Sequence, residues 1–387
     1  MINLLNNNKR PSGRSYFRKK THVVYGLLML VLISCGQSTE PDEGLLTYMT
    51  ADGSRKAVKS EKDWETKRLQ ILDSLQLVMG RLPETNNLPP LDIQYRDSLR
   101  TETYTRYSIR FTPAANEDVT AYLYVPHGVE TGKKSPAMLV LHGTGALGKR
   151  LVDGESPRHN RAQAKELAER GYVVIAPDYP SMGEQQDYDF DNDRYESGTM
   201  KAIFNHMRCV DLLTAREDVD PERIGVLGHS LGGHNAMFVG AFDTRLKVMV
   251  SSCGWTMLDY YDRGEEVNKR YGGRLGPFAQ KLYMPLFRTK YNLDGDRIPF
   301  DFDEIIASFA PRAFFSNSPL RDSNFDVEGV KVGMASAGEV YRFLDAEDKL
   351  QVRYPDAEHD WPVQTREEAY RFVDGIFDHS PRQLLVE

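Results

Sequence analysis

Cysteine, excess positive charge and long apolar runs are all scarce in this sequence of 387 residues. Three cysteines are too few for a disulfide scaffold in a chain of this length. The formal net charge of −7 argues against nucleic acid as the main partner, because phosphate binding needs a basic surface. An HExxH motif and Cys/His pairs at metal-ligand spacing are also lacking, so we expect no metal ion and no other cofactor.

The charge that is present is divided unevenly along the chain. Residues 1–34 carry six basic side chains and no acidic one, which leaves a net charge of −13 for the remainder. An apolar run follows the basic stretch at 23–33 and ends before Ser34 and Cys35. Its length suits the core of a signal peptide and is short of the about 20 residues that a membrane-spanning helix needs.

Residues 32–35 (Leu-Ile-Ser-Cys) resemble a bacterial lipobox. The resemblance implies that residues 1–34 are a lipoprotein signal peptide and that lipid is attached to Cys35. The exported domain would then be held at the bacterial cell envelope, on the periplasmic face or the cell surface, by its lipid alone. A plain signal peptide, or a start codon assigned too early, is the alternative.

The mature chain divides into three further parts. Residues 35–60 are polar and turn-rich, as in a tether. Residues 61–99 form an N-terminal helical extension, because residues 61–81 have apolar side chains at helical spacing before Pro83 breaks the chain. Residues 100–387 alternate buried strands with helices, which predicts an α/β domain with a mostly parallel, doubly wound sheet. We expect its strands near 103–111, 119–125, 137–141, 172–176, 223–227, 246–250, 313–315 and 350–354.

The sharpest motif is Gly-His-Ser-Leu-Gly-Gly at 228–233, between a buried strand and a helix. This is the context of a G-x-S-x-G nucleophile elbow, in which glycines permit a very tight turn and the serine hydroxyl is exposed above the sheet. Ser230 is therefore the candidate nucleophile. The alternative is a serine in a tight strand–helix turn that does no chemistry.

A serine hydroxyl needs a base, and the base needs an orienting acid. His359 follows the last expected strand, so its loop can reach over the sheet edge. Asp322 is the first acid after the strand at 313–315, which fits the chain order Ser, acid, His. Asp326, which can instead cap a helix, and Asp259 are the alternatives.

Five segments together resemble an α/β-hydrolase, close to bacterial serine esterases of the dienelactone-hydrolase-like and acetyl xylan esterase-like kind. These segments are 141–145, 176–180, 228–233, 310–312 leading to Asp322, and 359–362, within a region of about 100–380. The resemblance implies an oxyanion hole formed by the backbone N–H groups of Leu231 and of Thr144. Two departures are that true dienelactone hydrolases use cysteine where Ser230 stands, and that one group of deacetylases has glutamine after the serine.

The connection between the sixth strand and the acid-bearing strand, residues 254–308, is long and rich in aromatic and basic side chains. It is either a lid that binds sugar rings or an acidic group, or helical packing at the sheet edge. Trp361 next to His359 likewise either forms a pocket wall or packs in the core.

These features predict a serine hydrolase that cleaves carboxylic esters, of small molecules or carbohydrates, through an acyl-enzyme. A carbohydrate deacetylase is the more specific hypothesis. A serine peptidase on the same fold and a catalytically inactive, lipid-anchored binding protein are the alternatives. No feature of the sequence indicates an oligomeric state.

Overall fold

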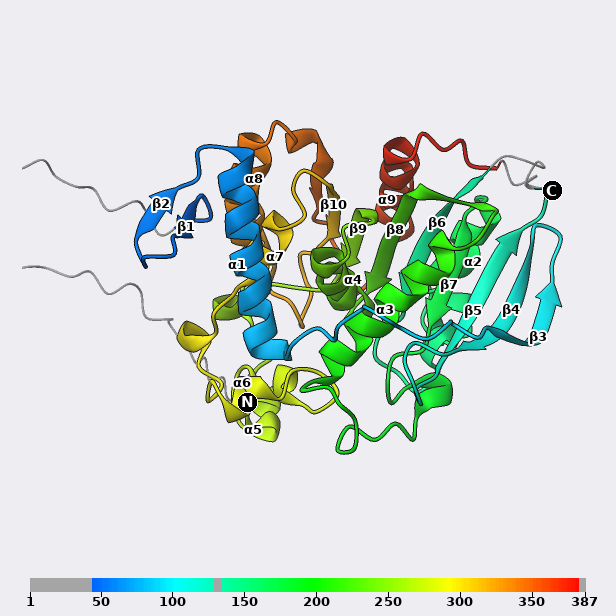
Figure 1. Cartoon of the computed structure of the whole chain (residues 1–387), viewed down its shortest axis with the longest axis horizontal. Helices are drawn as coiled ribbons and strands as arrows, with labels where there is room; N and C mark the ends of the chain where they lie inside the picture. Colours follow the sequence, from blue (N-terminus) through cyan, green and yellow to red (C-terminus); the bar gives the residue numbers. More distant parts are fainter. Residues whose placement is uncertain (1–43, 129–133, 383–387) are drawn as a thin grey trace, which may run out of the picture. The chain divides into compact units, whose positions relative to one another are not determined.

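The structure, a computed structural model, describes residues 44–128 and 134–382 (Figure 1). The expected signal peptide and Cys35 lie outside these residues. Within them, no helix combines the length and the apolar character that crossing a bilayer requires. The described residues belong to one unit, residues 41–387.

A nine-stranded sheet organises the domain, in the order β11-β10-β9-β8-β6-β7-β5-β4-β3. Strands β6 to β11 run parallel, whereas β3, β4 and β5 pair antiparallel at one side of the sheet, on the right of Figure 1. The strands are β3 (Gln94–Arg100), β4 (Tyr104–Phe111), β5 (Val119–Pro126), β6 (Ser135–Leu141), β7 (Val173–Pro177), β8 (Val219–His229), β9 (Leu246–Ser252), β10 (Ala313–Asn317) and β11 (Leu350–Arg353).

Helices cover both faces of the sheet, because its central strands are apolar on both sides. In β6, Ala137 and Leu139 belong to one core and Met138 and Val140 to the other. The first core includes α1, α3, α4, α7 and α8, and the second includes α2 and α9. The helices are α1 (Glu61–Met79), α2 (Gln163–Glu169), α3 (Gly198–Thr214), α4 (Leu231–Phe242), α5 (Glu265–Tyr271), α6 (Leu286–Thr289), α7 (Phe302–Ala307), α8 (Val327–Phe343) and α9 (Val363–Ile376). The doubly wound α/β class expected from the sequence is confirmed.

The sheet and the N-terminal region extend beyond what the sequence pattern predicts. Strand β3 joins the main sheet, although the sequence places the start of the α/β domain at residue 100. All seven residues of β3 are exposed, so an edge strand with two solvated faces shows no apolar alternation to detect. A two-stranded hairpin of β1 (Thr47–Met49) and β2 (Arg55–Ala57) lies within the expected tether 35–60.

The expected helix at 61–81 is present as α1, but its buried face includes only some of the apolar residues that the sequence pattern indicates. Trp64, Ile71 and Leu75 are buried, whereas Leu69 and Leu77 are each 51% exposed. The buried stripe follows the 3.6-residue period from Trp64, and Leu69 and Leu77 fall outside it.

Three partly buried carboxyl groups, those of Asp301, Asp303 and Glu304, gather at the start of α7. The Asp301 side chain caps the helix by accepting from the Phe302 N–H at 2.7 Å, and it also accepts from the Leu258 N–H at 3.0 Å. Burial raises the pKa of Asp301 from 3.8 to about 7, and it also raises the pKa values of Asp303 and Glu304. These carboxyl groups therefore oppose folding when they are ionised.

We expect Asp301→Asn to change how stability depends on pH. Because the folded pKa of Asp301 is raised, its contribution to stability is full below pH 3.8 and is lost as the pH rises to about 7. Asparagine caps a helix equally well and does not titrate. The Tm of the variant should therefore rise relative to that of the wild type between pH 5 and pH 8, as measured by calorimetry. A Tm difference that is independent of pH, or that falls with pH, would contradict this; Asp348→Asn, at an exposed acid, is the matched control.

Candidate functional site

Ser230 lies in the turn between β8 and α4 with φ 57° and ψ −121°, a conformation that L-residues rarely adopt. The surrounding glycines make this turn possible. A Cβ on Gly228 would lie 2.3 Å from the carbonyl carbon of Gly232, and one on Gly232 would lie 1.9 Å from the Leu141 oxygen. The Ser230 N–H donates to the Ser252 oxygen at 2.8 Å, which attaches the turn to β9. The expected elbow geometry is present.

The structure brings Ser230, His359 and Asp322 together in one line of hydrogen bonds. His359 Nε2 lies 2.9 Å from the Ser230 Oγ, and His359 Nδ1 lies 2.9 Å from both carboxylate oxygens of Asp322. The Asp322 side chain is 1% exposed and that of His359 is 14% exposed. The alternatives for the acid lie elsewhere: Asp326 caps α8 through the Glu328 N–H, and Asp259 is exposed.

Backbone hydrogen bonds join the loop that carries Asp322 to the loop that carries His359. Beyond the ends of β10 and β11, the N–H groups of Ser318, Leu320 and Arg321 donate to carbonyl oxygens of residues 353–357 at 2.9 to 3.0 Å. The Asp322 carboxylate also accepts from the Asn324 N–H at 2.8 Å. The parallel pairing of the two strands is thereby extended into the loops, and this holds the acid against the histidine.

The segment that contains Asn160 and Arg161 anchors the loop that carries His359. Arg161 forms an ion pair with Asp360 at 2.6 Å, and the Asn160 amide donates to the same carboxylate at 2.9 Å. The Asn317 amide donates to the Asp360 carbonyl at 3.1 Å. These supporting residues are not predicted from the sequence, because side chains in loops follow no helix or strand periodicity that would identify them.

The glycine turn at 142–145 lies against the nucleophile. A Cβ on Gly143 would lie 3.6 Å from the Ser230 Cβ, so the two backbones are close. His142 fixes the turn: its Nδ1 lies 2.7 Å from the Gly143 oxygen, and its Nε2 accepts from the Tyr179 N–H at 3.0 Å. Thr144 and Leu231, the expected oxyanion-hole residues, both border the cavity beside Ser230.

The connection 254–308 forms a wall over the nucleophile and is fixed at several points. The N–H groups of Gly198 and Thr199, at the start of α3, donate to the carbonyl oxygens of Lys281 and Tyr283. The Tyr179 hydroxyl donates to the Leu282 oxygen at 2.5 Å, and the Tyr283 hydroxyl lies 3.0 Å from the Thr144 Oγ1. The packing alternative therefore holds for part of the segment, and the binding of a sugar or an acidic group stays a prediction. Phe287 and Trp255 are buried in the core, whereas other aromatic side chains face the cavity.

Two cavities meet at Ser230. The first, of about 330 Å³, lies under the connection 254–308 and is bordered by Tyr261, Arg263 and Phe278, among others. The second, of about 400 Å³, lies on the other side of the serine, next to His359. Trp361 borders neither cavity and is fully buried in the core, so it packs.

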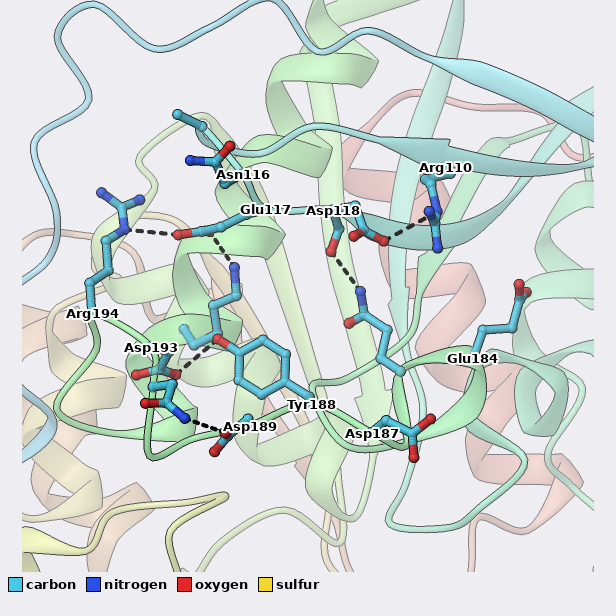
Figure 2. Close-up of a pocket in the computed structure, with 14 residues that line it drawn as sticks. Arg110, Asn116, Glu117, Asp118, Glu184, Asp187, Tyr188, Asp189, Asp193 and Arg194 are labelled. Carbon is cyan, nitrogen blue, oxygen red and sulfur yellow. Dashed lines mark hydrogen bonds and ion pairs between the residues drawn. The ribbon is translucent and has the colours of Figure 1, made fainter.

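A third cavity, of about 580 Å³, lies away from the triad (Figure 2). Its border contains many charged groups but no serine, cysteine or histidine. The charges are largely paired with one another: Figure 2 shows Arg194 turned toward Glu117 at 2.9 Å and Arg110 turned toward Asp118 at 3.2 Å. The border of this cavity therefore contains no serine–histidine or cysteine–histidine pair.

Cys253 lies beside the triad but is not equipped as a reactive thiolate. Donor atoms of Cys253, Asp322 and His359 lie within 4.8 Å of one another, which is close enough to hold a metal ion. However, both ring nitrogens of His359 are engaged by Ser230 and Asp322, and the Cys253 thiol donates to the Asp360 oxygen. Burial raises the pKa of this thiol well above 9.0, so it stays protonated. Cys209 and Cys253 are both buried free thiols.

The other histidines near the site are kept neutral by burial. His229 lies 5.1 Å from His359, measured between ring centres, and its Nδ1 lies 3.0 Å from the Ser252 Oγ. Burial, with the positive charges of Arg161 and Arg158, lowers the pKa of His229 well below 6.5. Burial lowers the pKa of His234 to about 4. Neither histidine reaches the Ser230 hydroxyl through a hydrogen bond, so His359 is the base that the structure offers.

The chain is similar to known hydrolases and esterases. A family model described as fungal glucuronyl esterase matches residues 173–345. The chain is 25% identical to the putative hydrolase YtaP of Bacillus subtilis over 76% of its own length and 95% of that protein. It is 30% identical to the carbohydrate esterase MZ0003, from an unknown prokaryotic organism, over 48% of its length and 45% of that protein. The chain thus spans less than half of MZ0003.

Solved structures share the fold. A glucuronoyl esterase from Solibacter usitatus superposes with a TM-score of 0.68 and 20% identity, covering 86% of this chain and 97% of that one. A structure described as a putative acetyl xylan esterase from Bacteroides fragilis gives a TM-score of 0.58 and 18% identity, covering 86% and 93%. The sheet, the elbow and these similarities show that the chain has the α/β-hydrolase fold and is a carboxylic ester hydrolase.

Proposed function

We propose that the protein hydrolyses esters of carbohydrates, with Ser230 as nucleophile, His359 as base and Asp322 as the orienting acid. The observation that carries this proposal is the continuous line of hydrogen bonds from Ser230 through His359 to Asp322. These hydrogen bonds place a base next to the Ser230 hydroxyl. The hydroxyl lies at a strained turn beside a cavity that is large enough for a ligand.

The reaction proceeds in two steps. The Ser230 Oγ attacks the ester carbonyl carbon while His359 takes the hydroxyl proton, and Asp322 stabilises the imidazolium. The N–H groups of Leu231 and Thr144 donate to the developing oxyanion. The carbon–oxygen bond to the alcohol then breaks, and His359 gives its proton to the departing oxygen. Water, activated by the same histidine, hydrolyses the acyl-enzyme and releases the acid.

Two observations support a carbohydrate substrate. Several of the relatives and structural neighbours are described as carbohydrate or glucuronoyl esterases. The first cavity is bordered by five tyrosine and phenylalanine rings, which offer flat apolar surfaces for a sugar ring. The rings belong to Tyr261, Tyr271, Phe278, Tyr283 and Phe325.

We expect Ser230→Ala to abolish ester hydrolysis. Removing the nucleophile of a triad lowers kcat by about 10⁶-fold, and the loss here should be at least about 10⁴-fold. The measurement is the release of nitrophenol from nitrophenyl acetate and butyrate, and of acetate from acetylated xylose. Ser54→Ala, in the exposed β1–β2 turn, is the control.

Activity that survives in Ser230→Ala would rule out this nucleophile. Cleavage of peptides but not of esters would favour the peptidase, and no cleavage at all would favour the inactive binding protein.

The assignment of the acid has its own test. Asp322→Asn should lower kcat by about 10⁴-fold, because an uncharged partner no longer holds the histidine in the right tautomer. Asp326→Asn is the matched control: asparagine caps α8 as well as aspartate does, so kcat should stay within about twofold of the wild type. The reverse ranking of the two variants would identify Asp326 as the acid.

We further propose that the protein is exported and anchored to the cell envelope through lipid on Cys35. The support is the order of the sequence features: a basic stretch, the short apolar run 23–33 and then Ser34 and Cys35. On this proposal the domain reaches the membrane through its lipid alone.

In cells fed a labelled fatty acid, the wild-type chain should carry the label and sediment with membranes. Cys35→Ala should lose the label and leave the membrane fraction, whereas Ser38→Ala should behave like the wild type. A labelled Cys35→Ala protein, or an unlabelled wild type, would contradict lipid attachment at this cysteine.

A further inference from the structure

The two cavities at Ser230 differ in their chemical character. Both are bordered by Thr144, Ser230 and Asn324, so the nucleophile stands at their junction. Leu231 borders only the first cavity, which we call the acyl chamber, and His359 borders only the second, which we call the alcohol chamber. The two sides of the serine therefore offer a substrate different surroundings.

The position of His359 decides which part of an ester lies in which chamber. The histidine must give its proton to the oxygen of the departing alcohol, so that oxygen has to lie within hydrogen-bond reach of Nε2. Nε2 already lies 2.9 Å from the Ser230 Oγ, on the side of the alcohol chamber. The alcohol therefore extends into this chamber, and the acyl group extends into the chamber under residues 254–308.

The charged side chains that border the alcohol chamber, apart from the histidines, are Arg158 and Arg161; no aspartate or glutamate of the described residues borders it. Arg161 is buried and committed to structure, because it pairs with Asp360 and donates to the His359 carbonyl. Arg158 is exposed, and within the part of the chain that the structure describes no carboxylate forms an ion pair with its guanidinium.

The positive charge of Arg158 influences a histidine next to the catalytic site. Together with burial and Arg161, it contributes to the low pKa of His229, whose ring neighbours that of His359. A chain with an overall charge of −7 thus has an uncompensated guanidinium at the entrance to its alcohol chamber. A guanidinium binds a carboxylate through two parallel hydrogen bonds, which gives selectivity for an anion.

We propose that the alcohol part of the substrate carries a carboxylate, bound by Arg158, so that the substrate is an O-acylated acidic sugar such as a uronic acid. This inference rests on the proposed ester hydrolysis at Ser230, and it makes Arg158 a specificity-determining residue. The acyl chamber is bordered mainly by aromatic side chains and by Arg263, and the inference concerns the alcohol chamber alone.

The test compares two pairs of esters that differ only in a carboxylate on the alcohol. One pair is methyl O-acetyl-galacturonoside and methyl O-acetyl-galactoside, and the other is 3-carboxy-4-nitrophenyl acetate and 4-nitrophenyl acetate. The measured quantity is the ratio of kcat/KM for the acidic ester to that for the neutral ester. For the wild type we expect a ratio of about ten, the size of a charge-assisted bidentate contact at a partly exposed site.

In Arg158→Gln this ratio should fall to near one. Arg158→Lys, which keeps the charge but not the planar fork, should give an intermediate ratio, and higher salt should lower the wild-type ratio through screening. Arg100→Gln, at an exposed arginine of β3 on the far edge of the sheet, is the matched control and should keep the wild-type ratio.

The outcomes separate this inference from the proposed function. Equal rates on both members of each pair, or a preference that persists in Arg158→Gln, overturn the inference while ester hydrolysis stands. Failure to cleave either sugar ester, with the charge preference intact on the aryl pair, overturns the carbohydrate function and supports the anion site. Loss of all activity in Arg158→Gln, with an unchanged Tm, would show a role other than substrate selection and also overturn the inference.

Discussion

The close approach of three backbone segments around Ser230 is the constraint on which the site depends. The end of β6, the end of β8 and the start of α4 pass so near one another that a single Cβ at Gly228 or Gly232 would overlap backbone atoms. The serine itself is held at φ 57°, a strain that typically costs about 1–3 kcal/mol. Because β6 leads directly into the glycine turn, the same contact fixes that turn relative to the nucleophile. The nucleophile and the proposed oxyanion donors are thus held together by the same backbone contact.

The other two members of the triad reach the serine from a separate support. Asp322 and His359 follow adjacent parallel strands, and backbone hydrogen bonds continue between their loops. Their mutual distance is therefore set by sheet pairing, the most regular feature of the fold. The side of the histidine loop is held by Arg161, which keeps the imidazole over the nucleophile. The loops that carry the two residues are thus held by backbone hydrogen bonds and by the Arg161–Asp360 ion pair.

The sequence predicts the parts of the molecule that follow a periodic pattern or a fixed chain order. The buried strands from 137 onward and the positions of Ser230, Asp322 and His359 belong to this class. Strand β3 could not be predicted, because both its faces are solvated and its sequence does not alternate. The role of Arg158 could not be predicted either, since an exposed arginine in a loop has no signature until the fold places it beside the histidine. Leu69 is an apolar residue at a spacing that suggests burial, but it lies on the solvent-facing side of α1 and is exposed.

The wall over the nucleophile supplies no member of the triad. Residues 254–308 leave the sheet after β9 and return at β10, and the short segment around Leu282 joins them to the start of α3 and to Tyr179. The triad and the wall of the acyl chamber are thus encoded in separate stretches of the chain. Substitutions in the wall can alter which acyl groups are accepted without disturbing the geometry of proton transfer. The same catalytic core can therefore be adapted to new esters by exchanging one contiguous segment.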